Sequence, residues 1–261
     1  MYAMERRDAI ERILLTHGRV AVVDLAEQFG VATETVRRDL DAMERDGLLS
    51  RVHGGAVSKE RSDSAELPVT ERSEQHSDAK LAIAARALDA IPAGFRGSIF
   101  LDAGTTTAAI ASLLSGRLAP QGSTADVVTH SVLLAPMLAG ASGITLTVIG
   151  GRIRGITAAA VGASTVQAIE ALRPDVAFVG ANGLSAEFGL STPDPDEAAV
   201  KSAIVRAARR VIVVADASKL GQELLVRFAD LDDIDALVTD APVAAHLSEA
   251  LERADVEVWV A

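Results

Sequence analysis

The sequence predicts an α/β protein in two parts: a small helical head and a larger domain built on a mostly parallel β-sheet. Two observations predict this class. Residues 1–57 carry apolar side chains at helical spacing, whereas from Asp78 onward short apolar strands alternate with helical segments. Hydrophobic residues make up 49% of the 261 residues but aromatic ones only 3%, so the core must consist mainly of Ala, Val, Ile and Leu.

The head is predicted to begin with two short helices. Apolar residues fall at helical spacing first at Ile10, Ile13 and Leu14, and then in the segment Val23 to Phe29. Gly30 ends the second helix, because the left-handed position after a helix favours glycine. A short turn therefore separates this helix from the next one.

A third helix is predicted from Thr33, whose hydroxyl can cap the first turn, to about Asp46. Val36, Leu40 and Met43 recur at positions i, i+4 and i+7 and form its buried face. The side chains that this register leaves off the core are those of Thr35, Arg37, Arg38 and Asp41.

A loosely alternating pattern after the third helix predicts a two-stranded hairpin. Residues 48–53 form its first strand, Gly54 and Gly55 its turn, and Ala56 and Val57 the returning strand. A helix, a short turn, a second helix that exposes Thr and Arg, and a hairpin wing together predict a winged helix-turn-helix. In that motif the second helix enters the major groove of DNA.

The exposed side chains of this motif suit contact with DNA. Arg37 or Arg38 can pair with guanine through two hydrogen bonds, and Thr33 and Thr35 can reach a phosphate or a thymine methyl group. The hairpin can reach the flanking backbone. The predicted DNA-binding residues are Thr33, Thr35, Arg37, Arg38, Arg51, His53, Gly54 and Gly55. Taken alone, the arginine pair also fits a solvated face with local ion pairs, but helix, turn, helix and wing together favour DNA binding.

Charge is distributed unevenly between the two parts. The chain has a formal net charge of −11, but residues 1–61 sum to −1, so −10 belongs to the larger part. A near-neutral head with clustered arginines can still face phosphate, and an acidic body discourages indiscriminate binding.

Several classes of protein are excluded by the sequence. Charged residues at positions 5–8 with no apolar stretch behind them predict no secretory signal, so a cytoplasmic location is expected. The 25 residues from Val127 to Gly151 lack charge, but Pro and Gly break them into a strand, a short helix and a second strand, so no membrane contact is expected. There is no cysteine, and the five histidines show no metal-ligand spacing, so neither a metal nor another cofactor is expected.

The larger part is predicted to follow a linker at residues 58–77, a polar stretch that contains Pro68. A helix begins at Asp78, and strands and helices then alternate to the end, which predicts a Rossmann-like, mostly parallel sheet covered on both faces. The domains are therefore residues 1–57 and 78–261. The predicted strands are Ser98–Leu101, Asp126–Thr129, Thr145–Ile149, Val176–Val179, Val211–Ala215, Ala236–Thr239 and Val256–Val260.

A candidate anion site follows the first of these strands. The run Asp102-Ala103-Gly104-Thr105-Thr106-Thr107 joins a buried strand to a helix. Free backbone amides at the helix start, with threonine hydroxyls and a glycine that allows close approach, form a cradle suited to a phosphate monoester. A capped strand-to-helix turn without a ligand is the alternative interpretation.

Polar residues at other strand ends are expected to converge with this run, because open α/β sheets bind ligands at the carboxyl ends of their strands. Lys201 or Lys219 can pair with phosphate charge, Asp102 or Asp196 can accept sugar hydroxyls, and Asn182 can do either. Each also fits a structural role, such as a surface ion pair or an ordinary turn. The candidate ligand-binding residues are Asp102, Gly104, Thr105, Thr106, Thr107, Arg154, Asn182, Gly183, Asp196, Lys201 and Lys219.

The stretch VVDLAEQFGVATETVRRDLDAMERDGLLSRVHGGAV resembles the winged helix-turn-helix of the DeoR family of bacterial transcriptional regulators. The run TVRRDL followed by RVHGGAV at this spacing is specific, and the resemblance continues to the last strand. It implies operator binding by Arg37, Arg38 and their neighbours, normally as a dimer or larger assembly. The expected partners are therefore operator DNA and further copies of the chain, in a dimer or tetramer.

The larger part resembles the DeoR-family sensor domain, whose fold is similar to that of ribose-5-phosphate isomerases. The resemblance implies that DAGTTT is the phosphate loop and that VADASKLG matches the isomerase strand end with its serine and lysine. Where such isomerases carry an acid-rich segment with the catalytic carboxylate, this chain has Asn182 and Gly183, so no catalytic residue is predicted. His130 stands where the family usually shows asparagine, and a capping role is expected for it.

The expected function is that of a transcriptional regulator, a repressor of genes for sugar uptake or catabolism. Its operator affinity would depend on a phosphorylated sugar bound as effector in the second domain. Two alternatives stay open: an active sugar-phosphate isomerase with a DNA-binding head, and an architectural DNA-binding protein whose body only oligomerises.

Overall fold

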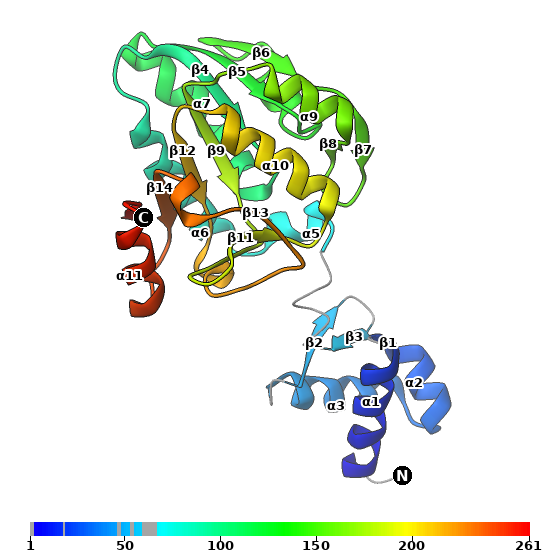
Figure 1. Ribbon diagram of the computed structural model, residues 1–261. Coiled ribbons are helices and arrows are strands. Elements are labelled where there is room, and N and C mark those ends of the chain that lie inside the picture. Colours follow the sequence, from blue (N-terminus) through cyan, green and yellow to red (C-terminus); the bar gives the residue numbers. More distant parts are fainter. Residues whose placement is uncertain (1–2, 18, 46–47, 53–54, 59–66) are drawn as a thin grey trace. The chain divides into compact units, whose positions relative to one another are not determined.

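The computed structural model describes residues 3–17, 19–45, 48–52, 55–58 and 67–261. The chain forms two compact units, Met1–Glu66 and Leu67–Ala261, and the second is described throughout (Figure 1). No helix in the described ranges is long and apolar enough to cross a membrane.

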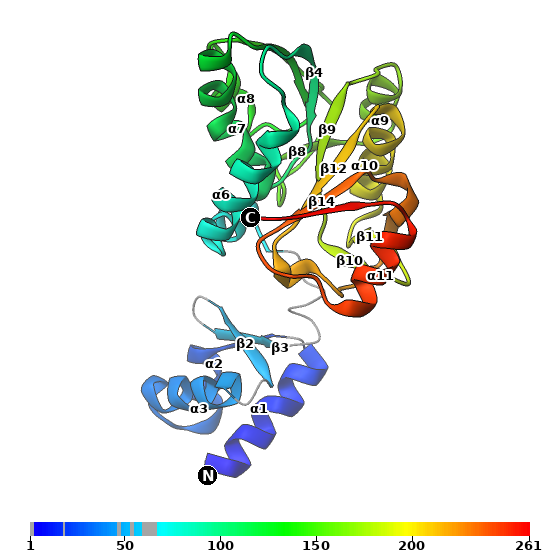
Figure 2. The same ribbon diagram turned by 90° about the vertical axis from the view of Figure 1, so that its left-hand side faces the viewer.

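The described part of the first unit consists of three helices and a three-stranded antiparallel sheet (Figure 2). The elements are α1 (Ala3–His17), β1 (Arg19–Ala21), α2 (Val22–Phe29), α3 (Thr33–Arg45), β2 (Leu49–Val52) and β3 (Gly55–Ser58). Strands β2 and β3 form the predicted hairpin, and β1 pairs with the other side of β3. The sequence did not indicate β1, because three residues are too few to show alternation.

The helices of the first unit bury the faces that the sequence predicts. Val36 and Leu40 are 0% exposed and Met43 is 1% exposed, whereas Arg37 and Arg38 on the same helix are exposed. The other buried apolar residues of this unit are Ile10, Leu14, Val20, Val22, Leu25, Ala26, Leu49 and Ala56. The periodicity of the three helices therefore determines the core of the head.

The turn between α2 and α3 agrees with the prediction at one residue and differs at another. Gly30 has a φ of 65°, the left-handed conformation expected of a glycine that ends a helix. Helix α3 begins at Thr33 itself, and the amides of Thr35 and Val36 donate to the carbonyl of Ala32. The cap predicted at Thr33 is therefore wrong, because Thr33 already lies in the first turn.

The second unit centres on a seven-stranded sheet with the order β15-β14-β12-β9-β4-β5-β6, in which all neighbours run parallel. The predicted strands are all present, with ends that differ by at most two residues. They are β4 (Arg96–Leu101), β5 (Thr124–Thr129), β6 (Ile144–Val148), β9 (Val176–Gly180), β12 (Val211–Val214), β14 (Ala236–Thr239) and β15 (Glu257–Val260).

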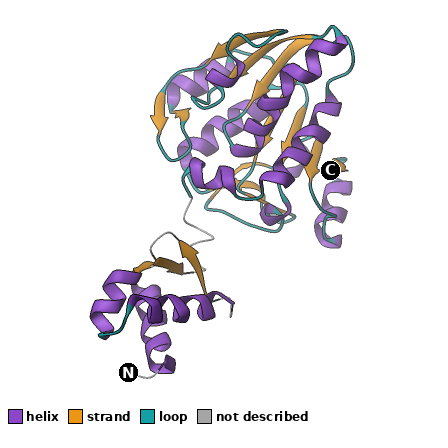
Figure 3. Ribbon diagram, turned by 180° about the vertical axis from the view of Figure 1, so that it is seen from behind, coloured by secondary structure: helices purple, strands orange, loops and turns teal. Residues whose placement is uncertain are grey.

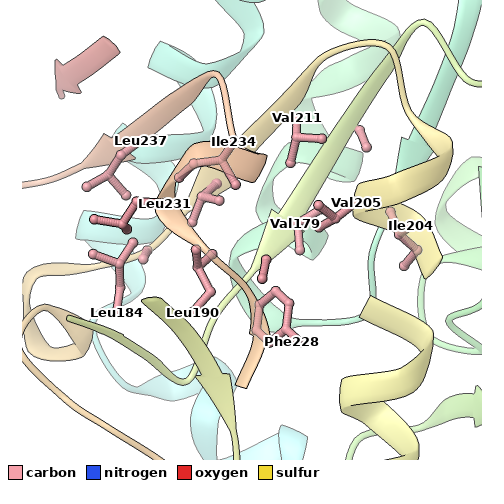
Figure 4. Packing of buried hydrophobic residues seen from close by; sticks show 14 of the residues in the cluster. Val179, Leu184, Leu190, Ile204, Val205, Val211, Phe228, Leu231, Ile234 and Leu237 are labelled. Atoms are coloured by element: carbon pink, nitrogen blue, oxygen red, sulfur yellow. The ribbon is translucent and has the colours of Figure 1, made fainter. Parts of the chain in front are cut away.

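Helices cover both faces of this sheet (Figure 3). Helices α6 (Ser77–Ala87), α7 (Thr105–Leu118) and α8 (Ala135–Leu138) share a core with Ile99 and Leu101 of β4. Helices α9 (Ala163–Glu170), α10 (Pro195–Ala207) and α11 (Ala245–Arg253) share the opposite core with Phe100. Figure 4 shows part of this core, including Val179 of β9 and Ile204 and Val205 of α10. Alternate residues of β4, β9, β12 and β14 thus serve different cores, as expected of a buried parallel sheet.

Short elements complete the second unit. Strands β7 (Arg152–Arg154) and β8 (Ala159–Val161) pair antiparallel, and β10 (Gly183–Ser185), β11 (Gly189–Thr192) and β13 (Val226–Ala229) form a small sheet. Four 3-10 turns lie at Leu88–Ala90, Ala119–Gln121, Ala217–Lys219 and Leu231–Asp233. None of these short strands was predicted from the sequence, because runs of three or four residues are too short to show alternation.

The predicted linker at residues 58–77 is too long. Helix α5 (Val69–Glu74) lies within it, and Leu67 onward belongs to the second unit. Val69 is buried and its amide donates to the carbonyl of Ile156, so a tertiary contact fixes this helix. The polar composition concealed α5, because one buried valine supplies no periodic signal.

Candidate functional site

A pocket lies at the carboxyl ends of the central strands of the second unit. The chain runs outward from β4 to β5 and β6 on one side, and the strands β9, β12, β14 and β15 follow on the other (Figure 1). The order therefore reverses between β4 and β9, and at such a switch point the loops diverge and leave room for a ligand. The pocket there has a volume of about 60 Å³.

Four segments of the second unit line this pocket: the end of α5 with the start of α6, the β4–α7 loop, the residues after β9 and the residues after β12. Lys201 of α10 forms part of its floor. The polar lining residues are Arg72, Gln75, His76, Lys80, Thr105, Thr106, Thr107, Asn182, Lys201, Asp216 and Lys219.

The β4–α7 loop presents the start of a helix to the pocket. Helix α7 begins at Thr105, and its first backbone hydrogen bond to the preceding loop runs from the amide of Ala108 to the carbonyl of Gly104, at 3.0 Å. The amides of the first helical residues, Thr105 to Thr107, have no intrahelical acceptor. The hydroxyl of Thr107 donates to Gly104, so it fixes the loop. This arrangement leaves backbone donors for an anion, aided by the positive end of the helix dipole.

Asp102 lies beneath the loop and not in the pocket. It is 0% exposed, and its carboxylate accepts the Gly180 amide at 3.0 Å and an ion pair from Lys201. Burial by itself raises the pKa of Asp102, but Lys201 and His130 outweigh it and lower the pKa to about 2. Asp102 therefore joins the ends of two strands and holds the lysine at the pocket floor.

Lys201 is held from three directions. Its Nζ donates to Asp102 and to the carbonyl of Gly180 at 2.8 Å, and it lies 5.5 Å from the centre of the Phe228 ring. Its side chain is only 6% exposed. A lysine fixed in this way presents a positive charge at a defined position, with little side-chain entropy left to lose on binding an anion.

His130, at the end of β5, links the same loop to β8. Its Nδ1 donates to the carbonyl of Ala160 at 2.8 Å, because a carbonyl can only accept. Its Nε2 lies 3.0 Å from the Asp102 carboxylate and 3.1 Å from the amide nitrogen of Ala103. His130 therefore connects the end of β5 to the β4–α7 loop, where the sequence predicts a capping role for it.

Lys80 of α6 is the buried cation of the opposite wall. Its Nζ donates to the carbonyl of Gln75 at 2.6 Å and to that of Arg72, so it holds the carboxyl end of α5. Burial lowers the pKa of Lys80; Asp216 opposes this shift, and the positive charges of Lys219 and Arg72 add to it. An anion in the pocket would favour the charged form of this lysine.

On the first unit, α3 presents the residues expected to contact DNA. Arg37 and Arg38 are exposed and lie 3.6 Å and 3.7 Å from the carboxylate of Glu34. The neighbouring Asp39 is instead buried, where it forms an ion pair with Arg6 of α1. The two arginines thus point outward while the aspartate between α1 and α3 stabilises the head.

Two family models match the chain: the DeoR-like helix-turn-helix domain over residues 6–62 and the DeoR C terminal sensor domain over residues 75–241. The chain belongs to the DeoR family. It is a DNA-binding transcriptional regulator with a helix-turn-helix head and a sensor domain. This confirms the resemblance that the sequence indicated.

Relatives of this DeoR-family regulator match along nearly their whole length. The HTH-type transcriptional regulator GlpR of Haloferax volcanii is 37% identical over 98% of this chain and 96% of its own. The glycerol-3-phosphate regulon repressor of Escherichia coli (strain K12) is 30% identical, over 96% of each chain. Among solved structures, ribose 5-phosphate isomerase A of Methanocaldococcus jannaschii has a TM-score of 0.43 and 19% identity over 57% of this chain and 56% of its own.

The pocket of this DeoR-family regulator contains seven of the candidate ligand-binding residues. They are Gly104, Thr105, Thr106, Thr107, Asn182, Lys201 and Lys219. Three strand ends that are separate in sequence, together with Lys201 from the middle of α10, therefore converge at the carboxyl edge of the sheet.

The other four candidates do not line the pocket. Asp102 is buried beneath it. Arg154 pairs with Asp194 and Glu197, and the exposed Asp196 pairs with Arg152, so these charges join the β7–β8 hairpin to α10. A Cβ on Gly183 would lie 2.4 Å from the carbonyl oxygen of Gln222, so this glycine is required for close backbone packing. These four residues thus have structural partners, and their contact with a ligand stays a prediction.

Among the predicted DNA-binding residues, Gly55 has a different role. It is buried in β3, and a Cβ there would lie 2.0 Å from the carbonyl oxygen of Val20 in β1. Glycine is thus needed so that β1 can approach β3. Arg51 lies in β2 opposite Ala56, and His53 and Gly54 lie outside the described residues.

Sequence reasoning missed the wall formed by α5 and the start of α6. Arg72, Gln75 and His76 gave no signal, because they lie in the polar stretch interpreted as a linker. Lys80 did give one: it lies three, four and seven residues before the buried Ile83, Ala84 and Ala87, so it shares the apolar face of α6. A lysine on a buried face requires hydrogen-bond partners, and the carbonyls of Arg72 and Gln75 are the partners of Lys80.

Proposed function

We propose that this regulator senses a phosphorylated sugar in the pocket at the carboxyl ends of β4, β9 and β12. The main support for this proposal is the positive charge of the pocket. Arg72, Lys80, Lys201 and Lys219 line it beside the amino end of α7, in a chain whose net charge is −11. Concentrated positive charge next to free backbone amides is the arrangement that a phosphate group needs. The name of the Escherichia coli relative, a glycerol-3-phosphate regulon repressor, supports the same class of ligand.

The lining residues have different roles in this proposal. The amides of Thr105, Thr106 and Thr107 and the hydroxyls of Thr105 and Thr106 bind the phosphate oxygens, and Gly104 allows the close approach. Lys201 and Lys219 neutralise the charge. Asn182, whose side-chain oxygen accepts a hydrogen bond from Thr192, offers its amide group to sugar hydroxyls.

We propose binding without turnover. Isomerisation needs a carboxylate or other base free to accept a proton next to a carbonyl. The Asp102 carboxylate is buried and engaged by Lys201, His130 and the Gly180 amide. The other acid at the pocket, Asp216, accepts from the amide and hydroxyl of Ser218 and caps a 3-10 turn. Both carboxylates therefore have structural partners.

The head would bind operator DNA through α3, with the wing on the flanking backbone. Arg37 and Arg38 would read bases, Thr33 and Thr35 would contact phosphate or a thymine methyl group, and Arg51, His53 and Gly54 would lie along the backbone. Binding to paired half-sites requires at least a dimer, so a dimer or tetramer in the cytoplasm is proposed. The regulated genes would serve sugar uptake or catabolism, with the protein acting as a repressor.

Helix α5 would couple effector binding to operator binding. It forms one wall of the pocket through Arg72 and Gln75, and it is the first described element after the segment that joins the two units. A ligand that contacts α5 would therefore act on the first described helix that follows the head in the chain. Effector and operator would then shift each other's affinity by linkage.

A thermal-shift screen of the full chain against phosphorylated sugars and their unphosphorylated parents tests the proposal. We expect stabilisation by phosphorylated forms only, about 3 kcal/mol when the ligand is at 100 times its Kd. Lys219→Ala should remove most of this effect, whereas Arg173→Ala, an exposed site outside the pocket, should not. Equal stabilisation by the parent sugars would contradict a phosphate site, and turnover of ribose 5-phosphate would favour the isomerase alternative.

A further inference from the structure

The two edge strands of the central sheet differ in how they are protected against pairing with another chain. At one edge, β15 carries the exposed Glu257, which lies 3.9 Å from Arg210. The ring of Trp259 in the same strand lies under two guanidinium groups, at 5.2 Å from Arg86 and 5.4 Å from Arg210. Charges of this kind are the usual means by which an edge strand avoids pairing with another chain.

The opposite edge, β6, has no such protection. Its sequence Ile-Thr-Leu-Thr-Val contains no charged residue, and Thr145, Thr147 and Val148 are exposed. Among the strands of residues 67–261, β6 pairs with β5 alone, so its outer backbone groups face away from the sheet. An uncharged, β-branched edge is a ready template for another strand.

Exposed apolar side chains gather around this edge. Val132, Leu133, Met137, Val148 and Ile153 are between 41% and 50% exposed. Two contacts bring together the segments that carry these residues. Thr129 at the end of β5 pairs with Val148 of β6, and the amide of Val132 donates to the carbonyl of Ala158 in the turn between β7 and β8. We call these five residues together with strand β6 the β6 face.

The residues of the β6 face carry no charge, and the neighbouring charges include Asp126 of β5, opposite Thr145, and Arg152 and Arg154 on either side of Ile153. No charged residue occurs from Val127 to Gly151, although the net charge of the chain is −11. Two copies of this chain repel each other over most of their surfaces, and the repulsion is smaller where the contacting strand of each copy carries no charge. A nucleic acid or a charged protein would form no ion pairs with strand β6 itself, whereas a second copy needs none.

We propose that the β6 face is the surface through which two copies of this chain associate. A two-fold axis beside β6 pairs this strand antiparallel with its own copy and continues the sheet across both subunits. The five apolar side chains then become buried against their equivalents. The proposal deepens the proposed function, which requires a dimer, by assigning that dimer to one surface of the sensor domain.

Sedimentation velocity of the full chain without DNA or effector tests this surface. We expect the parent chain to be dimeric at micromolar concentration and Val148→Glu to weaken association at least tenfold. The matched control is Val260→Glu on the other edge strand, since the two valines are 47% and 46% exposed. A monomeric parent chain, or dissociation by Val260→Glu but not by Val148→Glu, would overturn the proposal.

Crosslinking gives a second readout that does not depend on a destabilising charge. The chain has no cysteine, so a single introduced thiol reports one contact. With a short bismaleimide, Thr147→Cys should form a covalent dimer and Val260→Cys should not. Absence of a dimer band for Thr147→Cys and for Thr145→Cys would exclude pairing at β6. Thermal stabilisation of these variants by phosphorylated sugars is measured separately, so failure of the interface and failure of the effector site are distinguishable.

Discussion

At the scale of single residues, Asp102 shows how a buried charge organises the site of this regulator. It is 0% exposed and contacts groups from β5, β9 and α10 through His130, Gly180 and Lys201. A carboxylate at this depth is tolerated only because a cation and several hydrogen bonds satisfy it. The ion pair in turn fixes the ammonium group that faces the pocket. Asp102 is thus a positioning residue, and removal of its charge leaves Lys201 buried without its partner.

The depressed pKa of Asp102 predicts an acid-dependent loss of stability. Burial opposes ionisation, but Lys201 and His130 lower the pKa from 3.8 to about 2. The ionised carboxylate therefore adds on the order of 2 kcal/mol to the free energy of unfolding. This contribution is fully present above about pH 4 and is lost as the pH falls toward 2. Urea unfolding across this range should show a shallower pH dependence in Asp102→Asn. The exposed Asp232→Asn serves as the control, and an identical pH dependence in Asp102→Asn and the parent chain would contradict the prediction.

Arg38 gives a prediction for the head. Its side chain is 79% exposed on α3 and forms a long, exposed ion pair with Glu34 at 3.7 Å, so its removal should barely affect folding. Arg38→Ala should weaken operator binding by about 1–3 kcal/mol and relax base discrimination if the guanidinium reads a base. Gel shifts on operator and scrambled DNA measure this, with Arg12→Ala on α1 as the control. Loss of stability with unchanged operator discrimination would assign Arg38 a structural role instead.

At the scale of elements, the pocket depends on where α7 begins. Strand β4 ends at the switch point, and α7 then begins after Gly104 with its first residues lining the cavity. Helices α5 and α6 form the facing wall, held by the hydrogen bonds of Lys80 to the carboxyl end of α5. The two walls come from different helices, so neither element alone makes the site.

A carboxylate placed at the start of α7 should occupy the position of the phosphate. Thr106→Glu puts a negative charge beside the amides that would bind the effector, and the helix dipole tolerates it there. We expect the operator affinity of this variant to stay within about threefold of the parent value and to no longer change with phosphorylated sugar. Ser112→Glu on the exposed side of the same helix is the control. A normal effector response in Thr106→Glu would show that the phosphate binds elsewhere.

At the scale of the whole molecule, the two units differ in net charge as well as in function. The near-neutral head carries exposed arginines, and the acidic sensor domain collects basic side chains in one pocket. The charge of the sensor domain thus disfavours binding to nucleic acid at places other than the head. Allosteric regulation then requires only that effector and operator favour different arrangements of the same chain.

Linkage makes that regulation reciprocal. If a phosphorylated sugar changes operator affinity by some factor, saturating operator DNA must change the affinity for the sugar by the same factor. Titration calorimetry of the full chain with and without operator measures it, and scrambled DNA is the control. A typical coupling of about 1–3 kcal/mol corresponds to a 5- to 150-fold change in each direction. Unequal factors would show that the sugar acts through an additional equilibrium, such as assembly.

The sequence by itself determined most of the fold. Helical spacing identified the buried faces of α1, α2 and α3, and apolar runs identified all seven strands of the central sheet. These features are local, because each residue's environment follows from the period of its own element. Among the elements that the sequence did not predict, β1 and α5 are stabilised by partners far along the chain, whereas the short strands have too few residues to show a period.

For the site, the sequence determined which strand ends carry polar residues, and seven of the candidates line one pocket. Only the tertiary structure decided that Asp102 lies beneath this pocket, that Arg154 and Asp196 join a hairpin to α10, and that α5 closes the facing wall. The physical reason is that a charged side chain acts through whichever partner lies within hydrogen-bonding distance. Residue type and spacing restrict those partners, but the packing of distant segments selects them.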